Sequence, residues 1–405
     1  MENKWLRAAL PALLIHGSIG TVYAWSVFKQ GIADNIGTPV VNVEWAFSIA
    51  ILFLGLSAAI LGNFVEQNIK KSALLATLFF VVGMFGTGIS IQRKSLIGIY
   101  IFYGVIMGIG LGIGYLTPVK NLMLWFKENK GLGTGLAVAG FGLSKMIFSP
   151  IMINLQQKFG LWQMFIILSI VFALMMVIGA SLIQKPADWK EIPLKNHFNP
   201  LSLFQNKNFV GIWLMFYLNI TAGLAIISQE KDILTSLKSS SGSVIFSVTA
   251  IATIVSIDAF FNAAGRIGFA SISDRLKDRN TIYQVIFLIS TIMALLSYCL
   301  PENNFFVSFV VVVTFFFINS GYGGGFSALP PLLADRFGMR AISKIHGAAL
   351  TAWAVAGLSG NQLASYIVHV LHMPYKNVYI AIAFLYLIAF IISKVVVKPN
   401  QTVIN

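Results

Sequence analysis

The sequence predicts an all-α membrane protein in which twelve transmembrane helices form two six-helix bundles. Hydrophobic residues make up 57% of the 405 residues and charged residues only 10%, whereas a soluble domain carries roughly a quarter charged residues. Apolar runs of about 20 residues recur along the whole chain, and each can cross a hydrocarbon core of roughly 30 Å. A lipid bilayer is therefore the expected environment.

Six apolar runs lie in each half of the chain. The first exceeds the core of a signal peptide and leads into further spans, so we expect it to remain as helix one. A polar segment, 184–206, separates a predicted N-terminal bundle, 1–183, from a C-terminal bundle, 207–405. The expected spans are 8–28, 45–64, 72–91, 97–124, 132–154, 161–183, 208–228, 244–272, 281–299, 305–333, 345–370 and 377–396.

The distribution of basic residues predicts the orientation. Lys and Arg are more numerous in the loops on the side of the amino terminus. Because basic residues resist translocation, we expect a multi-pass protein of the cytoplasmic membrane with both termini and the linker in the cytoplasm. This topology accounts for the net charge of +14 without nucleic acid, since no basic domain exists. One Cys and five scattered His predict no disulfide, metal site or cofactor.

The two halves show faint internal similarity. Pro118 of the fourth span corresponds to Pro330 of the tenth, which is 212 residues later. The loop residue Glu66 corresponds to Asp274, which is 208 residues later. Similar offsets near half the chain length favour two related bundles, as in many transporters.

Arg266 gives the strongest functional signal. It lies eight residues before Asp274, where the eighth span should end, and so roughly 12 Å inside the membrane. An arginine at that depth costs roughly 2.5 to 3.5 kcal/mol and keeps its proton, so it needs a partner or a hydrated cavity. A guanidinium holds a carboxylate through two parallel hydrogen bonds, which predicts a small organic anion as the ligand. The alternatives are an internal salt bridge and snorkelling to the cytoplasmic surface.

Two polar residues share a ridge with this arginine. Asp258 and Asn262 precede Arg266 at four-residue steps, so the three side chains could line one cavity. A desolvated Asp258 could take up a proton or neutralise the empty arginine. The alternative places Asp258 near the outer mouth, where it would be fully hydrated.

Other candidates depend on position alone. Tyr23, Tyr115 and Tyr322 lie mid-span beside small residues, which leave room for a ring to cover a ligand, although core packing explains them equally well. Lys120 and Lys145 are expected to snorkel to an interface. His16 is expected to be a packed residue that forms hydrogen bonds.

The sequence resembles a known family in several motifs spread over nearly the whole chain, at 23–28, 110–126, 131–142, 262–275 and 323–331. These motifs resemble the major facilitator superfamily, specifically its oxalate/formate antiporter branch, which is similar to the monocarboxylate transporters. The resemblance implies the major facilitator fold and alternating access around a site between the bundles. In that site Arg266 would grip the carboxylate while Tyr23, Tyr115 and Tyr322 enclose the anion.

Two departures from the family pattern refine this expectation. Trp353 stands where the oxalate exchanger has a lysine, so a dianion would be poorly neutralised. Asn262 stands where monocarboxylate transporters place an aspartate, which leaves Asp258 as the candidate for proton coupling. We therefore expect a secondary active transporter of small monocarboxylates of the lactate, pyruvate or formate type, coupled to protons, and not an enzyme. An oxalate/formate-type anion exchanger and a carboxylate sensor on a transporter scaffold are the alternatives.

Overall fold

The computed structural model describes residues 3–189, 200–239, 241–300 and 305–399. Within these ranges the regular structure is helical apart from one isolated bridge between Lys238 and Val244. Ten helices are each long and apolar enough to cross a membrane, and a bent pair, Trp5–Ala24 with Val27–Ile36 at 56°, makes an eleventh candidate. A further 24-residue helix, α14, completes a set of twelve long elements. The predicted all-α membrane fold is confirmed.

The described residues of the first half form eight α-helices with short π and 3₁₀ segments between them. These elements are η1 Trp5–Ala9, α1 Leu10–Ile19, η2 Gly20–Ala24, α2 Trp25–Ile36, α3 Val40–Gln67, α4 Ile69–Gln92, α5 Leu96–Ile99, η3 Tyr100–Met107, α6 Gly108–Trp125, α7 Lys130–Phe159 and α8 Leu161–Leu182. The elements α5, η3 and α6 run on as a single span.

Seven α-helices lie in the part of the second half that the structure describes. Its elements are η4 Pro200–Gln205, α9 Lys207–Ile227, α10 Glu230–Ser236, α11 Val248–Ser273, α12 Asn280–Cys299, α13 Phe305–Phe337, α14 Ile342–Ser365, η5 Tyr366–Val370 and α15 Lys376–Val395. The short helix α10 falls between two expected spans and has no counterpart among the predicted elements.

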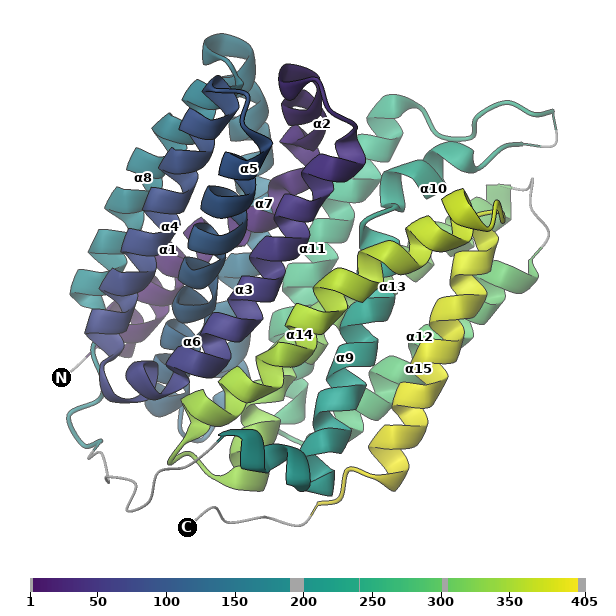
Figure 1. Cartoon of the computed structure of the whole chain (residues 1–405). Coiled ribbons are helices and arrows are strands. Elements are labelled where there is room, and N and C mark those ends of the chain that lie inside the picture. The colour runs from purple at the N-terminus through teal and green to yellow at the C-terminus, as the bar shows by residue number, and fades with distance from the viewer. Residues whose placement is uncertain (1–2, 190–199, 240, 301–304, 400–405) are drawn as a thin grey trace.

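The two halves stand side by side in Figure 1, with α1 to α8 on one side and α9 to α15 on the other. The start of α1 and the finish of α15 lie at the same end of the molecule, which we call the terminal end. The other end, where α2 and α10 lie, is the distal end. The predicted boundary at 184–206 stays a prediction, and residues 190–199 lie outside the described ranges.

The main helix pairs that join the halves are α3 with α14 and α7 with α11, and α7 also contacts α13. The small-residue stretch 131–142 lies in the second pair and permits a close approach. A Cβ atom added to Gly131 would lie only 2.0 Å from the carbonyl oxygen of Ala270. Any side chain at this position would therefore push α7 away from α11.

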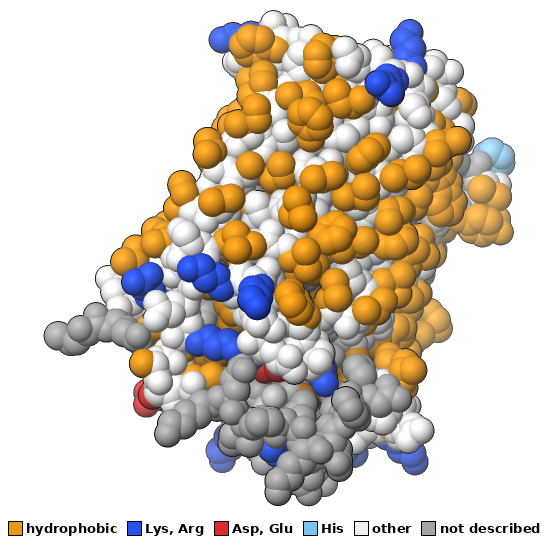
Figure 2. Space-filling model, turned by 60° about the vertical axis from the view of Figure 1, so that its left-hand side comes forward, with side chains coloured by type: hydrophobic (Ala, Val, Ile, Leu, Met, Phe, Trp, Pro, Cys, Tyr) orange, Lys and Arg blue, Asp and Glu red, His pale blue; other side chains and the backbone are white. Residues whose placement is uncertain are grey.

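The lateral surface is apolar, as a bilayer requires. Figure 2 shows hydrophobic side chains spread over the middle of this face, with Lys and Arg side chains towards its two ends. Large apolar residues such as Ile60, Leu174 and Phe384 are 75%, 63% and 62% exposed. Contact with lipid explains why these apolar side chains are exposed, since the same exposure would favour aggregation in water.

Candidate functional site

Arg266 on α11 is fully buried against α7 and α13. Its side chain is 0% exposed, so it does not snorkel. Its Nε donates a hydrogen bond to Asn262 Oδ1 at 2.8 Å. Among the residues that the structure describes, Nη1 and Nη2 have no hydrogen-bond partner, and no carboxylate pairs with this guanidinium. The outer edge of the guanidinium is therefore available to a ligand.

Two aromatic rings flank the guanidinium. Its central carbon lies 5.8 Å from the ring centre of Phe141 on α7 and 5.4 Å from that of Phe326 on α13. Both distances suit a cation–π contact, which partly compensates the buried charge. No sequence pattern distinguishes these two rings from the other Phe residues of the chain.

Further aromatic residues from both halves complete an enclosure around the arginine. The Trp353 ring centre lies 5.5 Å from that of Tyr115 and 4.5 Å from that of Phe326. The hydroxyl of Tyr23 lies 3.1 Å from that of Tyr322 and so links the two halves. We call this group the aromatic cage; it consists of Tyr23, Tyr115, Phe141, Tyr322, Phe326 and Trp353.

The cage contains polar atoms that are not satisfied. Tyr115 OH and Trp353 Nε1 are buried and have no hydrogen-bond partner within the described ranges. Together with the two nitrogens of Arg266 they make a set of donors converging on one region. The structure thus brings together Arg266, Asn262, Tyr23, Tyr115, Tyr322 and Trp353, and their roles in binding remain predictions.

The close packing of α11 on α13 fixes the direction of the arginine. A Cβ atom added to Gly323 would lie 2.3 Å from the carbonyl oxygen of Asn262 and 3.0 Å from Cγ of Arg266. The stem of Arg266 therefore lies directly against the backbone of α13. This contact, with the hydrogen bond to Asn262, limits how far the guanidinium can turn.

A chain of side-chain hydrogen bonds leads from the arginine to Asp258. Asn262 Nδ2 donates to Asn319 Oδ1 at 2.6 Å, and Asn319 Nδ2 donates to Asp258 Oδ2. Asp258 is only 2% exposed, so it is not the hydrated carboxylate of the alternative prediction. Asn319 was not identified from the sequence, because a single Asn before a run of glycines has no distinguishing spacing.

The expectation for Lys120 is wrong. Lys120 is 2% exposed, forms an ion pair with Glu66, and donates to the Glu66 carbonyl oxygen at 2.9 Å. A buried counter-charge on α3 replaces snorkelling. Lys145 is half-buried at the distal end. His16 is packed as expected, with Nδ1 2.6 Å from the Ala137 carbonyl oxygen.

A cavity of about 80 Å³ lies between the halves at the distal end. Tyr23, Trp25 and Lys145 line it from the first half, and Leu224 and Ile227 line it from the second. Because Tyr23 belongs to both the cavity and the aromatic cage, the cavity borders the cage on its distal side.

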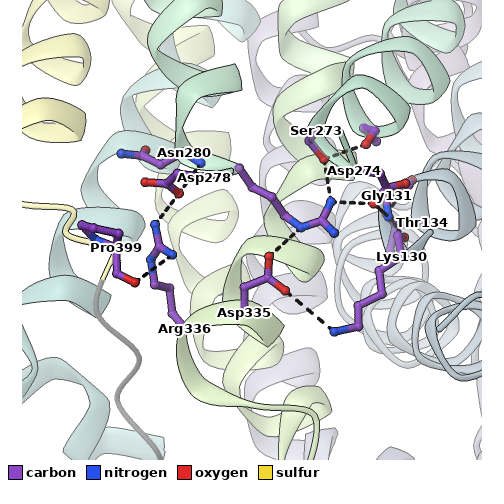
Figure 3. A network of polar contacts seen from close by, with 12 residues as sticks. Lys130, Gly131, Thr134, Ser273, Asp274, Asp278, Asn280, Asp335, Arg336 and Pro399 are labelled. Carbon is purple, nitrogen blue, oxygen red and sulfur yellow. Dashed lines mark hydrogen bonds and ion pairs between the residues drawn. The ribbon is translucent and has the colours of Figure 1, made fainter. Parts of the chain in front are cut away.

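The terminal end is closed by hydrogen bonds between the halves. The carboxylate of Asp274 accepts from the backbone N–H groups of Gly131 and Leu132 at 2.8 and 2.9 Å. Figure 3 shows Asp274 against the start of α7, with Asp335 directed towards Lys130 at 3.7 Å. We call the contacts of Asp274 with α7, and the similar contact of Glu66 with α14, the terminal latch. It separates the aromatic cage from this end.

No group of three or more His, Cys, Asp or Glu side chains is placed to hold a metal ion within the described ranges. The polar chemistry of the site is therefore that of one guanidinium, two amides, a carboxyl group and aromatic hydroxyl and indole groups.

Comparisons with known proteins identify the family. A family model described as the Major Facilitator Superfamily matches residues 12–361. The chain is 28% identical over 354 residues to the uncharacterized MFS-type transporter YhjX of Escherichia coli (strain K12), covering 85% of this chain and 84% of that protein. It is 23% identical over 377 residues to the oxalate:formate antiporter of Oxalobacter formigenes, covering 90% of this chain and 85% of that protein.

A solved structure shares the fold. The crystal structure of a bacterial homologue of the iron transporter ferroportin in an outward-facing state aligns with a TM-score of 0.74 at 12% identity, over 95% of this chain and 97% of that one. With the shared helical fold and the matching family model, the assignment rests on both sequence and fold. The chain belongs to the Major Facilitator Superfamily and is a membrane transporter rather than an enzyme.

Proposed function

We propose that this transporter carries small monocarboxylates, such as lactate, pyruvate or formate, across the cytoplasmic membrane together with a proton. The observation that carries the proposal is the buried edge of Arg266, whose Nη1 and Nη2 have no partner among the described residues. A buried charge without a counter-ion is costly. A carboxylate would satisfy both nitrogens at once and place a negative charge in direct contact with the guanidinium.

The surroundings favour a small substrate with a single charge. The rings of the aromatic cage can cover a short aliphatic chain, while Tyr115 OH and Trp353 Nε1 can donate to further oxygen atoms. Trp353 adds no charge at the position where the family resemblance leads one to expect a second cation. The similarity to an oxalate:formate antiporter supports a carboxylate substrate, and the single cation favours a monoanion over oxalate.

The distribution of contacts supports alternating access. The terminal latch closes one end of the interface between the halves, and the 80 Å³ cavity at the distal end approaches Tyr23. With both termini in the cytoplasm, this conformation would receive substrate from outside. Opening the latch and closing the cavity would then release the substrate inside.

Proton coupling follows from the membrane potential. Moving an anion into a cell with a negative interior costs roughly 2.3 kcal/mol per charge for each 100 mV. A proton carried with the substrate removes that cost, and Asp258 is the buried carboxylate joined to the binding arginine. Exchange for an outgoing anion would also remove the cost. The transport assay described below distinguishes proton symport from anion exchange.

Reconstituted protein provides the test. Purified transporter in proteoliposomes should take up labelled lactate, pyruvate or formate when an inward proton gradient is imposed, and unlabelled monocarboxylates should compete. Neutral analogues such as lactamide, and organic cations, should not compete. Competition by neutral or cationic compounds alone would overturn the assignment, while uptake that needs internal anion and ignores the gradient would identify an exchanger.

A further inference from the structure

We propose that Glu230 and Asp258 together form one proton-binding site at the distal end of the second half, and that Asn319 and Asn262 connect this site to Arg266. The inference rests on the proposed function, because it assigns the site at which the co-transported proton is held. Glu230 lies in a loop between expected spans in the sequence, and only the fold brings it to this position.

The two carboxylates are buried and incompletely satisfied. Glu230, in the first turn of α10, is 3% exposed, and Asp258 on α11 is 2% exposed. Glu230 Oε1 and Asp258 Oδ1 have no hydrogen-bond partner in the part of the chain that the structure describes. The helices α10 and α11 pack together, and the Glu230 carboxylate acts electrostatically on Asp258. A proton on one of these oxygens would lower the cost of burying an acceptor without a partner and would remove the repulsion between the two carboxylates.

The surrounding charges place the pair at the interface between the halves. Lys145 of α7 acts electrostatically on both carboxylates and lines the distal cavity. Lys29 and Glu44, which form an ion pair at 2.5 Å, line the same cavity. The other charged residues in the first turn of α10, Lys231 and Asp232, are exposed. Among the described residues, Lys145 is the cation that acts on both carboxylates, and it belongs to the other half.

Burial raises the pKa of Glu230 to about 7, against the opposing effect of the Lys145 ammonium. A proton that is bound near neutral pH can be taken up and released with the modest pH differences found across a cell membrane. The two buried carboxylate oxygens without hydrogen-bond partners thus agree with the raised pKa of Glu230.

The hydrogen-bond chain has only one possible direction. A guanidinium can only donate, so Asn262 must turn its oxygen towards Arg266 Nε. Its amide nitrogen then donates to Asn319 Oδ1, and the Asn319 nitrogen donates to Asp258 Oδ2. Because Oδ2 already accepts this bond, the free position for a proton on Asp258 is Oδ1, on the side without a partner. Aligned amide dipoles strengthen one another and join the two ends of the chain.

The charges balance for one proton per substrate. Without substrate, Arg266 and Lys145 offset the ionised Glu230 and Asp258. A bound monocarboxylate leaves one excess negative charge, and a single proton on the carboxylate pair restores neutrality. Substrate binding should therefore increase proton affinity at the pair, and protonation should increase substrate affinity by the same factor.

The experiment uses Glu230→Gln and Asp258→Asn in the full chain, with Asp232→Asn as the matched control from the same first turn of α10. Two assays are run on proteoliposomes: exchange of labelled for unlabelled lactate at equal pH, and accumulation driven by a pH gradient. A third follows proton uptake by purified protein when lactate is added in weak buffer at pH 7. Wild type and Asp232→Asn should accumulate lactate and take up protons.

Each carboxylate variant should lose most of the accumulation driven by the pH gradient, because it lacks one of the two carboxylates that hold the proton, and should lose substrate-induced proton uptake. Exchange should be the less affected activity. Asn319→Leu, which keeps both carboxylates, should also reduce proton uptake upon lactate addition. This result would show that the hydrogen-bond chain to Arg266 is needed for proton uptake, because Asn319→Leu removes no acidic group.

Two outcomes would overturn the inference. If Glu230→Gln accumulates lactate and takes up protons as well as Asp232→Asn does, Glu230 is not part of the proton-binding site. Lactate exchange by wild type without proton uptake would reject the proton site while leaving a carboxylate carrier in place. Failure of wild type to bind or exchange any carboxylate would instead reject the proposed function, so the two failures are distinguishable.

Discussion

Glu66 and Asp274 each bind the first turn of a helix in the opposite half of the chain. Glu66 Oε2 accepts from the backbone N–H of Ser343 at 2.8 Å, at the start of α14. Asp274 accepts from Gly131 and Leu132 at 2.8 and 2.9 Å, at the start of α7. The two contacts are counterparts, because the same offset that relates Glu66 to Asp274 nearly relates the two helix starts. A carboxylate at a helix N-terminus also interacts favourably with the helix dipole.

Neutralising one side of the terminal latch should open the terminal end. In Asp274→Asn the amide accepts less strongly from α7 and loses its charge pairing with Arg279. We expect a loss of about 1 to 2 kcal/mol from the closed state and a rise of roughly 5- to 30-fold in the open population. Thiol labelling of Ser327→Cys, a buried position whose carbonyl contacts Thr134, measures this in a Cys299→Ser background. The exposed Asp34→Asn is the control, and an unchanged labelling rate in Asp274→Asn contradicts the prediction.

Arg266→Lys should lose most of the transport although the charge is kept. A lysine is a point charge on a flexible stem and cannot reproduce a two-pronged grip on a carboxylate. Loss of one charge-assisted hydrogen bond costs roughly 1.5 to 3 kcal/mol, so lactate binding should weaken by roughly 10- to 100-fold. Arg275→Lys, an exposed position just beyond α11, should transport normally. Near-normal uptake by a well-expressed Arg266→Lys protein is the contrary result.

Trp353→Lys should shift preference towards dicarboxylates. The substitution introduces a second cation into the aromatic cage, where the Trp353 ring centre lies 5.5 Å from that of Tyr115 and 4.5 Å from that of Phe326. A dianion then gains a second partner, while a monoanion gains less. Competition by oxalate relative to lactate should rise in Trp353→Lys and stay unchanged in Trp353→Phe, which reduces the ring without adding charge. Equal competition profiles for both variants would remove Trp353 from the substrate site.

The sequence predicts a site residue where a charged or polar side chain interrupts an otherwise apolar run. Arg266 stands out because a permanent charge inside an apolar run needs an explanation, and Asn262 and Asp258 follow from helical spacing. The sequence does not predict the burial of Lys120, because its partner, Glu66, is 54 residues away and only tertiary packing brings them together.

The remaining members of the site could not be found in this way. Phe141 and Phe326 are two among 33 Phe residues, and a ring that faces an arginine has the same local pattern as one that faces lipid. Glu230 appears in the sequence as an ordinary loop carboxylate, because its burial depends on α10 folding back against α11. The fold itself was more predictable, since the length and apolar character of a span are local properties.

The stability of the protein should fall between about pH 4.5 and pH 7 through Glu230. Burial raises the pKa of this carboxyl from 4.5 to about 7, so in this range the folded state binds more protons than the unfolded state. Unfolding free energy therefore decreases as pH rises and levels off above the folded pKa. Melting temperatures of the purified protein from pH 5 to pH 8 should decline more steeply for wild type than for Glu230→Gln, which has no proton to lose. Parallel curves for the two proteins would show that the Glu230 ionisation is not shifted by folding.

Asn262→Asp should make substrate affinity strongly pH-dependent. Asn262 presents its oxygen to Arg266 Nε and its nitrogen to Asn319. An aspartate keeps the first contact, loses the second donor, and places a negative charge beside the guanidinium.

That charge would partly neutralise Arg266 before any substrate arrives, so a carboxylate would bind less tightly. Protonation of the introduced carboxyl group would remove the competition, and the lactate affinity of Asn262→Asp should therefore improve as pH falls from 8 to 6, more than that of wild type. Asn262→Leu provides the matched control, because it loses the same hydrogen bonds without a titratable group. Its affinity should be reduced by a similar factor at both pH values. Binding by Asn262→Asp that follows the wild-type pH profile would mean that position 262 does not influence the charge that Arg266 offers to a carboxylate.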